Sequence, residues 1–191
     1  MMDLFSPLDI RKVHFKNRAV MAPMVLNCAG EDGSVTPAFQ DFYAARARQA
    51  GFDAVELHAC HDYWLNYFLS PYFNHRIDEY GGCLDNRFRL LRETTEEVLA
   101  AVGGEILVGV RLSMADFVDG GLGLDETLEI GRHLEAIGVD YLSASAGIGL
   151  TQFRMSPPSD VPRGRLLVFG RARSIVEAIG EGLDAAMNIG N

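Results

Sequence analysis

The chain has 191 residues, 48% of them hydrophobic, which is enough to bury the core of one domain. Its net charge of −9 and its isoelectric point near 5.0 argue against a nucleic-acid partner, since no cluster of lysine and arginine interleaves with aromatic residues. No stretch approaches the length needed to cross a bilayer, so we expect a cytoplasmic protein with no membrane partner.

Short apolar runs alternate with helical segments along the chain. The runs are continuous, which is typical of parallel strands covered on both faces. They span residues 18–24, 53–58, 106–112, 140–144 and, with a weaker pattern, 185–189. Alternation of strand and helix predicts an α/β fold.

The helical segments carry start and stop signals. Thr36 and Pro37 predict a helix that runs to about Ala50. A second helix follows Asp85 and a third opens at Asp125. The apolar faces of these two helices comprise Phe88, Leu91, Val98, Leu99 and Val102 in the second and Leu128, Leu134 and Ile137 in the third. Helix C-cap glycines are predicted before three strands, at Gly51, Gly138 and Gly182.

A spacing of roughly 40 residues between units favours a (β/α) barrel, with a doubly wound sheet as the alternative. Neither GxGxxG nor GxxxxGK[ST] follows a strand, so a dinucleotide fingerprint and a P-loop are both absent from the sequence. Polar residues instead follow the strand ends, where a barrel builds its active site. They are residues 24–27, His58 and His61, Arg111 and Ser113, Ser143 and Ser145, and Asn188 and Asn191.

His58 ends a predicted strand, and His61 follows three residues later. Two imidazoles at this spacing suit the binding of one substrate oxygen, and the phenol of Tyr63 could donate a proton beside them. A purely structural alternative is that one histidine caps the next helix while the other packs. A metal site would need a third ligand, and we expect Cys60 and Glu56 to point away from the pair, so no metal is predicted.

Arg111 closes the apolar strand ILVGVRL, where an arginine needs an anionic or strongly polar partner. Its structural explanation is a salt bridge to an acidic neighbour such as Glu56, and its functional explanation is a cation that faces a cofactor. The three cysteines, Cys28, Cys60 and Cys83, contain no CxxC pair, which predicts free thiols rather than disulfides, a zinc ribbon or an iron–sulfur site.

Three segments together resemble the old yellow enzyme family of FMN-dependent ene-reductases. They read LFSPLDIRKVHFKNRAVMAPM, AGFDAVELHACHDYWLNYFLSPYFNHRIDEYGGCLDNRFR and VGVRLSMADFVDGG. The last segment and PPSDVPRG are most similar to the branch that contains 2,4-dienoyl-CoA reductase and 2-enoate reductase. The resemblance implies a TIM-barrel flavoprotein with FMN at the C-terminal face of the barrel.

The resemblance also implies roles for single residues. Pro23, Met24 and Val25 would pack against the flavin, and Arg111 would lie beside its N1–C2 carbonyl edge. The carbonyl oxygen of an activated alkene would bind His58 and His61, and Tyr63 would donate the proton. NADH or NADPH would be the reductant, and the substrate an enone, an enoate or an enoyl thioester.

The chain departs from the family between residues 36 and 50. There FYAARAR runs directly into QAGFDAVELH, as though two helices had been spliced near residues 46–50 and the strands between them deleted. The resemblance places Asn191 in the loop after the seventh strand, so the sequence reads as internally deleted and C-terminally truncated. We therefore expect residues 1–191 to form a single partial barrel of about five parallel strands, which self-associates as a homo-oligomer.

Three functions are compatible with these residues. The first is an FMN-dependent NAD(P)H oxidoreductase of the ene-reductase type. The second is a non-catalytic barrel remnant or assembly module without flavin. The third is a metal-dependent lyase or hydrolase that uses His58, His61 and an acidic residue.

Overall fold

The computed structural model describes residues 4–10, 13–19, 37–38, 51–102, 104 and 106–151. The chain divides into two compact units, residues 1–55 and residues 56–191, each of which is considered by itself. No helix within the described ranges has the length and apolar content that crossing a membrane requires.

In the first unit the described residues form a small antiparallel hairpin. Strand β1 (Leu8–Ile10) pairs with β2 (Val13–Phe15), with Leu8 opposite Phe15 and Ile10 opposite Val13. The sequence analysis did not predict this hairpin, because three-residue strands are too short to show a period. Pro37 and Ala38 are helical, as predicted. The rest of the predicted helix 36–50, nearly all of the predicted strand 18–24 and the whole of the predicted strand 185–189 lie outside the described residues.

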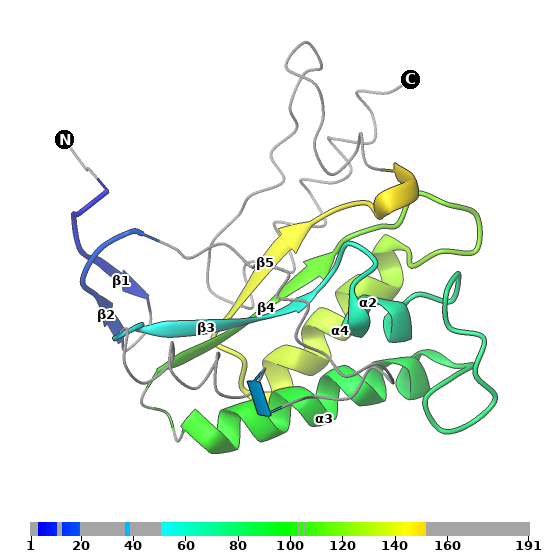
Figure 1. The fold of residues 1–191 in the computed structure, drawn as a ribbon, viewed down its shortest axis with the longest axis horizontal. Helices are drawn as coiled ribbons and strands as arrows, with labels where there is room; N and C mark the ends of the chain where they lie inside the picture. The colour runs from blue at the N-terminus through cyan, green and yellow to red at the C-terminus, as the bar shows by residue number, and fades with distance from the viewer. Residues whose placement is uncertain are drawn as a thin grey trace, which may run out of the picture. The chain divides into compact units, whose positions relative to one another are not determined.

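The second unit is built around a three-stranded sheet whose order is β3-β4-β5 (Figure 1). These strands are β3 (Ala54–Ala59), β4 (Leu107–Ser113) and β5 (Tyr141–Ser145), and they confirm three of the predicted apolar runs. Strands β4 and β5 are parallel, with Arg111 in register with Ser143. Parallel pairing through helical connections confirms the predicted α/β class.

The described part of the second unit also contains three helices and a short 3-10 turn. They are α2 (Trp64–Leu69), α3 (Leu84–Val102), α4 (Leu124–Ile137) and η1 (Gly149–Thr151). As predicted, α4 ends at a left-handed glycine: Gly138 has φ 108°, and its N–H bonds the carbonyls of Leu134 and Glu135. Helix α2 is short and was not predicted as a separate element.

One face of the sheet packs against these helices to form the core. Side chains alternate between the two faces of a strand, so every second residue of β4 and β5 belongs to this layer. Helices α3 and α4 cover it with residues from their predicted apolar faces. The main members are Ala59, Leu69, Phe88, Leu91, Val110, Leu112, Ile130, Leu134, Leu142 and Ala144.

A buried arginine ties the three helices together. Arg87 of α3 is only 5% exposed at its side chain and donates to the carbonyl oxygens of Leu69 and Gly82 and to the carboxylate of Glu126 in α4. A buried guanidinium needs this many acceptors, because each unsatisfied donor would carry a desolvation cost. Arg87 therefore links the C-terminal end of α2 to the N-terminal ends of α3 and α4.

The opposite face of the sheet is polar. Glu56 and His58 of β3, Arg111 and Ser113 of β4, and Tyr141, Ser143 and Ser145 of β5 occupy the alternate positions. Close to the start of this face the ring of Tyr141 lies over Gly109, where a Cβ atom would stand 2.2 Å from the ring. The sequence analysis predicted continuous apolar strands covered on both faces. Strand β4 is indeed buried on both sides except at Arg111, which is partly exposed. The face that carries Arg111 is polar, whereas the other face is apolar.

Candidate active site

A tight turn follows β3 and carries the histidine that the sequence analysis placed after the strand. The Tyr63 N–H bonds the carbonyl oxygen of Cys60 at 3.3 Å, and both central residues have positive φ, 58° at His61 and 50° at Asp62. The His61 N–H is held by Ser113 Oγ at 3.3 Å. Tyr63 is the N-cap of α2 and makes no side-chain capping bond, so the interpretation of a histidine as the helix cap is wrong.

The turn places the side chains of His61 and Tyr63, the other two predicted catalytic residues, next to His58. The ring centroid of His58 lies 5.4 Å from that of His61 and 5.2 Å from that of Tyr63, both in edge-on arrangements. His61 Nε2 is in hydrogen-bond contact at 2.5 Å with Oγ of Ser145, the last residue of β5. The hydroxyl therefore helps to determine which nitrogen of His61 carries the proton.

Both imidazoles are neutral at physiological pH. Burial lowers the pKa of His58 to about 4, with smaller contributions from His61 and Arg111. Burial also lowers the pKa of His61, and Arg111 adds to the effect while Asp62 opposes it. A neutral imidazole has one N–H donor and one acceptor, so the pair can donate to an oxygen without a formal charge.

Arg111 is paired with a carboxylate. Its Nε lies 2.9 Å from Oε1 of Glu56, which confirms the structural explanation given for this arginine. Burial raises the pKa of Glu56, although Arg111 lowers it. Ser143, in register with Arg111, lies close enough to Glu56 to help lower that pKa, yet its buried hydroxyl makes no ordinary hydrogen bond with a described residue.

Cys60 does not point away from the histidines, so that prediction is wrong. Residues 56, 58 and 60 are spaced by two and share one side of an extended chain, and the Cys60 Sγ lies 3.5 Å from His58 Nε2. Within the described ranges, the ligand atoms of His58, Cys60 and His61 all lie within 4.8 Å of one another. Burial raises the pKa of the Cys60 thiol to about 12. Cys60 and the exposed Cys83 are free thiols, as predicted, and Cys28 lies outside the described residues.

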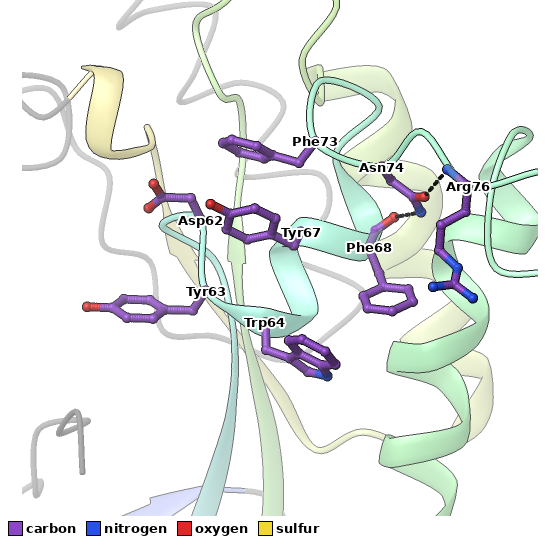
Figure 2. Close-up of a pocket in the computed structure, with 8 residues that line it drawn as sticks. All are labelled: Asp62, Tyr63, Trp64, Tyr67, Phe68, Phe73, Asn74 and Arg76. Carbon is purple, nitrogen blue, oxygen red and sulfur yellow. Dashed lines mark hydrogen bonds between the residues drawn. The ribbon is translucent and has the colours of Figure 1, made fainter. Parts of the chain in front are cut away.

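An open cavity of about 490 Å³ is lined by residues of the turn and of α2, with Phe73, Asn74 and Arg76 beyond the helix (Figure 2). Its walls are mainly the aromatic side chains of Tyr63, Trp64, Tyr67, Phe68 and Phe73. Tyr67 and Phe73 stack with ring centroids 4.3 Å apart. Tyr63 belongs both to the lining of the cavity and to the group of side chains around His58, so the two features share this residue.

The predicted flavin contacts Pro23, Met24 and Val25 lie outside the described residues, and their roles stay predictions. The sequence analysis missed the contributions of Asn66 and Asp116, which are buried behind the turn. The partner of Asp116 at Ser70 is distant in the sequence, so no local pattern could have found it. Asn66 bonds the N–H of Asp62, four residues earlier, and that short spacing is a signal that the sequence did contain. Ser113 and Ser145 had been noted at strand ends, and the structure adds their contacts with His61.

Comparison with known proteins gives the family. The profile of the NADH:flavin oxidoreductase / NADH oxidase family matches residues 35–155. NADPH dehydrogenase of Bacillus subtilis (strain 168) is 44% identical over 104 residues, which is 54% of this chain and 30% of that protein. NADH oxidase of Thermoanaerobacter brockii is 39% identical over 121 residues, covering 63% of this chain and 19% of that protein.

Solved structures agree with this result. Histamine dehydrogenase from Rhizobium sp. 4-9 superposes with a TM-score of 0.59 at 29% identity, over 76% of this chain and 20% of that one. A 2-naphthoyl-CoA reductase in complex with 2-naphthoyl-CoA superposes with a TM-score of 0.52 at 32% identity, over 61% of this chain and 19% of that one. These likenesses confirm a fold derived from the (β/α) barrel, to which the described residues contribute three strands in the second unit.

The chain spans about a third or less of the length of these relatives. Residues 35–155 include the turn, the histidine cluster and the Arg111 strand, which belong to two of the three segments that carry the sequence resemblance. The chain belongs to the NADH:flavin oxidoreductase / NADH oxidase family, the family of the old yellow enzyme.

Proposed function

We propose that this chain carries the substrate-oxygen site of an FMN-dependent oxidoreductase that uses NADH or NADPH to reduce the C=C bond of an activated alkene. The observation that supports it best is the grouping of His58, His61 and Tyr63 at the end of β3. The family membership makes flavin chemistry the expected context for this grouping.

The two histidines would bind the carbonyl oxygen of an enone, an enoate or an enoyl thioester. As neutral imidazoles they would each offer one N–H and withdraw electron density from the conjugated alkene. Negative charge develops on that oxygen as the β-carbon accepts hydride, so these hydrogen bonds strengthen in the transition state.

Tyr63 would supply the proton to the α-carbon. Tyr63 is 47% exposed and its ring stands edge-on to that of His58, so its phenol would be available to a ligand held by the histidines. The aromatic cavity that it lines would accept the apolar body of the substrate (Figure 2). A planar conjugated substrate suits such walls, since aromatic rings stack with other flat groups.

FMN, once reduced by NADH or NADPH, would supply the hydride. The polar face of the sheet suits the nitrogen and oxygen edge of its ring, because Arg111 provides a cation and Ser143 a buried hydroxyl that lacks an ordinary hydrogen bond. Arg111 would hold the N1–C2 carbonyl edge, while Pro23, Met24 and Val25 would pack along the ring. The Glu56 carboxylate would compete for Arg111 and weaken its effect on the flavin.

An absorbance spectrum of the purified chain, before and after addition of FMN and desalting, tests the proposal. Retained flavin with a shifted spectrum, followed by NADPH-dependent reduction of cyclohexenone, is the expected result. Protein that stays colourless after reconstitution would contradict the proposal and favour the barrel remnant without flavin. The double substitution His58→Ala/His61→Ala serves as the control for turnover.

Assembly belongs to the same proposal. The polar face of the sheet leaves Arg111 and Glu56 only partly covered by described residues, at 26% and 23% side-chain exposure. We expect a homo-oligomer in which a second copy contributes to the barrel. Sedimentation equilibrium across a hundredfold range of protein concentration tests this, and a monomer throughout would contradict it.

One observation favours a second candidate, a site for a thiophilic divalent cation such as Zn²⁺. Two neutral imidazoles and a thiol with ligand atoms within 4.8 Å form a donor set that zinc accepts after a small adjustment. Calorimetric titration with ZnCl₂ distinguishes it: Cys60→Ser should abolish binding, while Cys83→Ser, at an exposed thiol, should not. Equal affinity in both variants would exclude the site.

A further inference from the structure

The turn that follows β3 has an unusual backbone. Two consecutive non-glycine residues, His61 and Asp62, have left-handed φ values of 58° and 50°. Hairpin-type turns with two positive φ values are ordinarily occupied by glycine, asparagine or aspartate, because a Cβ atom crowds the backbone there. Histidine and aspartate tolerate positive φ better than most residues, but they carry a steric cost that glycine does not, so hydrogen bonds from neighbouring groups add to the stability of the turn.

Each of the two left-handed residues has its N–H bound by a side chain from elsewhere. The His61 N–H bonds Ser113 Oγ at 3.3 Å, and the Asp62 N–H bonds Asn66 Oδ1 at 2.7 Å. The turn's own closing bond, from Tyr63 to Cys60, measures 3.3 Å. The contact with Asn66 is therefore the shortest of the three that stabilise the turn.

Asn66 is well placed for this task. It lies in the first turn of α2 and is completely buried. Behind it stands the buried carboxylate of Asp116, which accepts bonds from Ser70 Oγ at 2.5 Å and from the Leu122 N–H at 2.8 Å.

The amide NH₂ of Asn66 and Oδ1 of Asp116 make no ordinary hydrogen bond, yet Asn66 is close enough to help lower the pKa of Asp116. Burial has the larger effect and raises that pKa. The hydrogen bond from the Asp62 N–H requires the amide oxygen of Asn66, and not its NH₂ group, to face the turn.

We propose that Asn66 is a positioning residue that holds the Cys60–Tyr63 turn in its left-handed conformation and thereby places His61 and Tyr63 around His58. The role of Asn66 in holding the turn does not depend on any activity. The effect of the turn on catalysis rests on the function proposed above. Glycine at position 62 would remove the need for Asn66, because glycine adopts positive φ without a steric cost.

The test is a rescue experiment with four variants. Asn66→Ala removes the acceptor, and Asp62→Gly removes the strain. The double variant Asp62→Gly/Asn66→Ala should behave like the parent. Asp62→Ala/Asn66→Ala is the matched control, since it also lacks the Asp62 carboxylate but keeps a Cβ atom.

The first readout requires no flavin. The NMR readout is the set of ¹H–¹³C ring signals of His61, which are assigned by comparison with His61→Gln and recorded at one pH. These signals should shift in Asn66→Ala. They should return to the parent positions in Asp62→Gly/Asn66→Ala but not in Asp62→Ala/Asn66→Ala. Asn74→Ala removes another buried asparagine, which bonds the carbonyls of Phe68 and Tyr80, and should leave the His61 signals in place.

The second readout uses the flavin-loaded protein. The dissociation constant for phenol should rise about tenfold in Asn66→Ala, as expected for a buried N–H that loses its partner, and should recover with glycine at position 62. If the chain holds no flavin, this readout disappears while the ring signals still report, so a failure of the proposed function remains distinct from a failure of this inference.

Three results would overturn the inference. In the first, Asn66→Ala leaves the His61 signals unchanged. In the second, the signals move but glycine at position 62 does not restore them, which would make Asn66 an ordinary core residue. In the third, Asn66→Ala fails to fold and the Asp62→Gly/Asn66→Ala variant fails as well. Recovery of folding by glycine alone would support the inference.

Discussion

The Arg111 guanidinium and the Glu56 carboxylate lie 2.9 Å apart, from Nε to Oε1, across the neighbouring strands β4 and β3. The sequence left two explanations for Arg111, a salt bridge or a cation for a cofactor. The structure confirms the first without opposing the second, because Arg111 lies on the polar face of the sheet that also carries His58. The shifted pKa of Glu56 should be measurable in the dependence of protein stability on pH.

Glu56→Gln should flatten one part of the dependence of stability on pH. The pKa of Glu56 is raised above its ordinary 4.5, mainly by burial, so between 4.5 and the raised value the folded protein holds a proton that the unfolded chain has released. The stability contributed by this group is therefore complete below pH 4.5 and falls as pH rises through the raised pKa.

Urea denaturation of the parent and Glu56→Gln, at intervals between pH 4 and pH 7, measures this difference. The free energy of unfolding of the parent should fall relative to that of the variant as pH increases. A constant difference across the range would show that Glu56 is not desolvated in the folded protein.

Replacement of both histidines should abolish ligand binding without unfolding the chain. In His58→Ala/His61→Ala the phenol-induced charge-transfer band of bound flavin is expected to disappear, since both donors to the ligand oxygen are lost. His133→Ala is the control, because His133 is half-exposed on α4 and contacts Phe88 and Glu129 instead. Unaltered phenol affinity in the double variant would refute the oxygen-binding role.

His58 should contribute a second pH effect, of opposite sign to that of Glu56. Its pKa is about 4 in the folded protein against an ordinary 6.5, so the unfolded chain takes up a proton at a higher pH than the folded one. Its contribution is present above pH 6.5 and falls as pH decreases toward 4. His58→Gln should remove this part of the acid destabilisation, as judged by thermal unfolding between pH 4 and pH 7.

Gly109→Ala should destabilise the sheet by about 1–3 kcal/mol, because its Cβ atom would stand 2.2 Å from the Tyr141 ring. Gly123→Ala is the matched control: no atom lies within 4 Å of its Cβ position, and its φ of −107° suits any residue. Denaturant midpoints for the two variants measure the contrast. Equal stability would mean that Tyr141 does not lie over Gly109.

The strands, the long helices and the family were predictable from local sequence. Apolar runs gave β3, β4 and β5 to within one residue at their ends, and Gly138 marked the end of α4. The predicted apolar face of α3 is only partly correct, since Phe88 and Leu91 are buried while Val98 and Leu99 are half-buried. The sequence analysis did not anticipate that Arg87 of α3 is buried and paired with Glu126 of α4.

The error over Cys60 shows how far the alternation of a strand can be applied. Residues two apart in an extended segment point to the same side, and this relationship continues past the last residue of β3. Applied correctly, it would have placed Glu56, His58 and Cys60 together from the sequence alone. The position of His61 could not be obtained in this way, because the turn reverses the chain through two left-handed residues.

The sequence by itself determined which residues are available for chemistry and in which order the strands and helices occur, because both depend on local composition and short-range periodicity. Only the tertiary structure decided that Ser113 and Ser145 contact His61, that Asn66 and Asp116 stand behind the turn, and that Glu56 partners Arg111. These contacts join residues on different elements, and the pairing of parallel strands through intervening helices sets their distances. The conformation of the turn depends both on Asn66, which is only four residues from Asp62, and on Ser113, which is distant in the sequence and which only the tertiary structure brings to the turn.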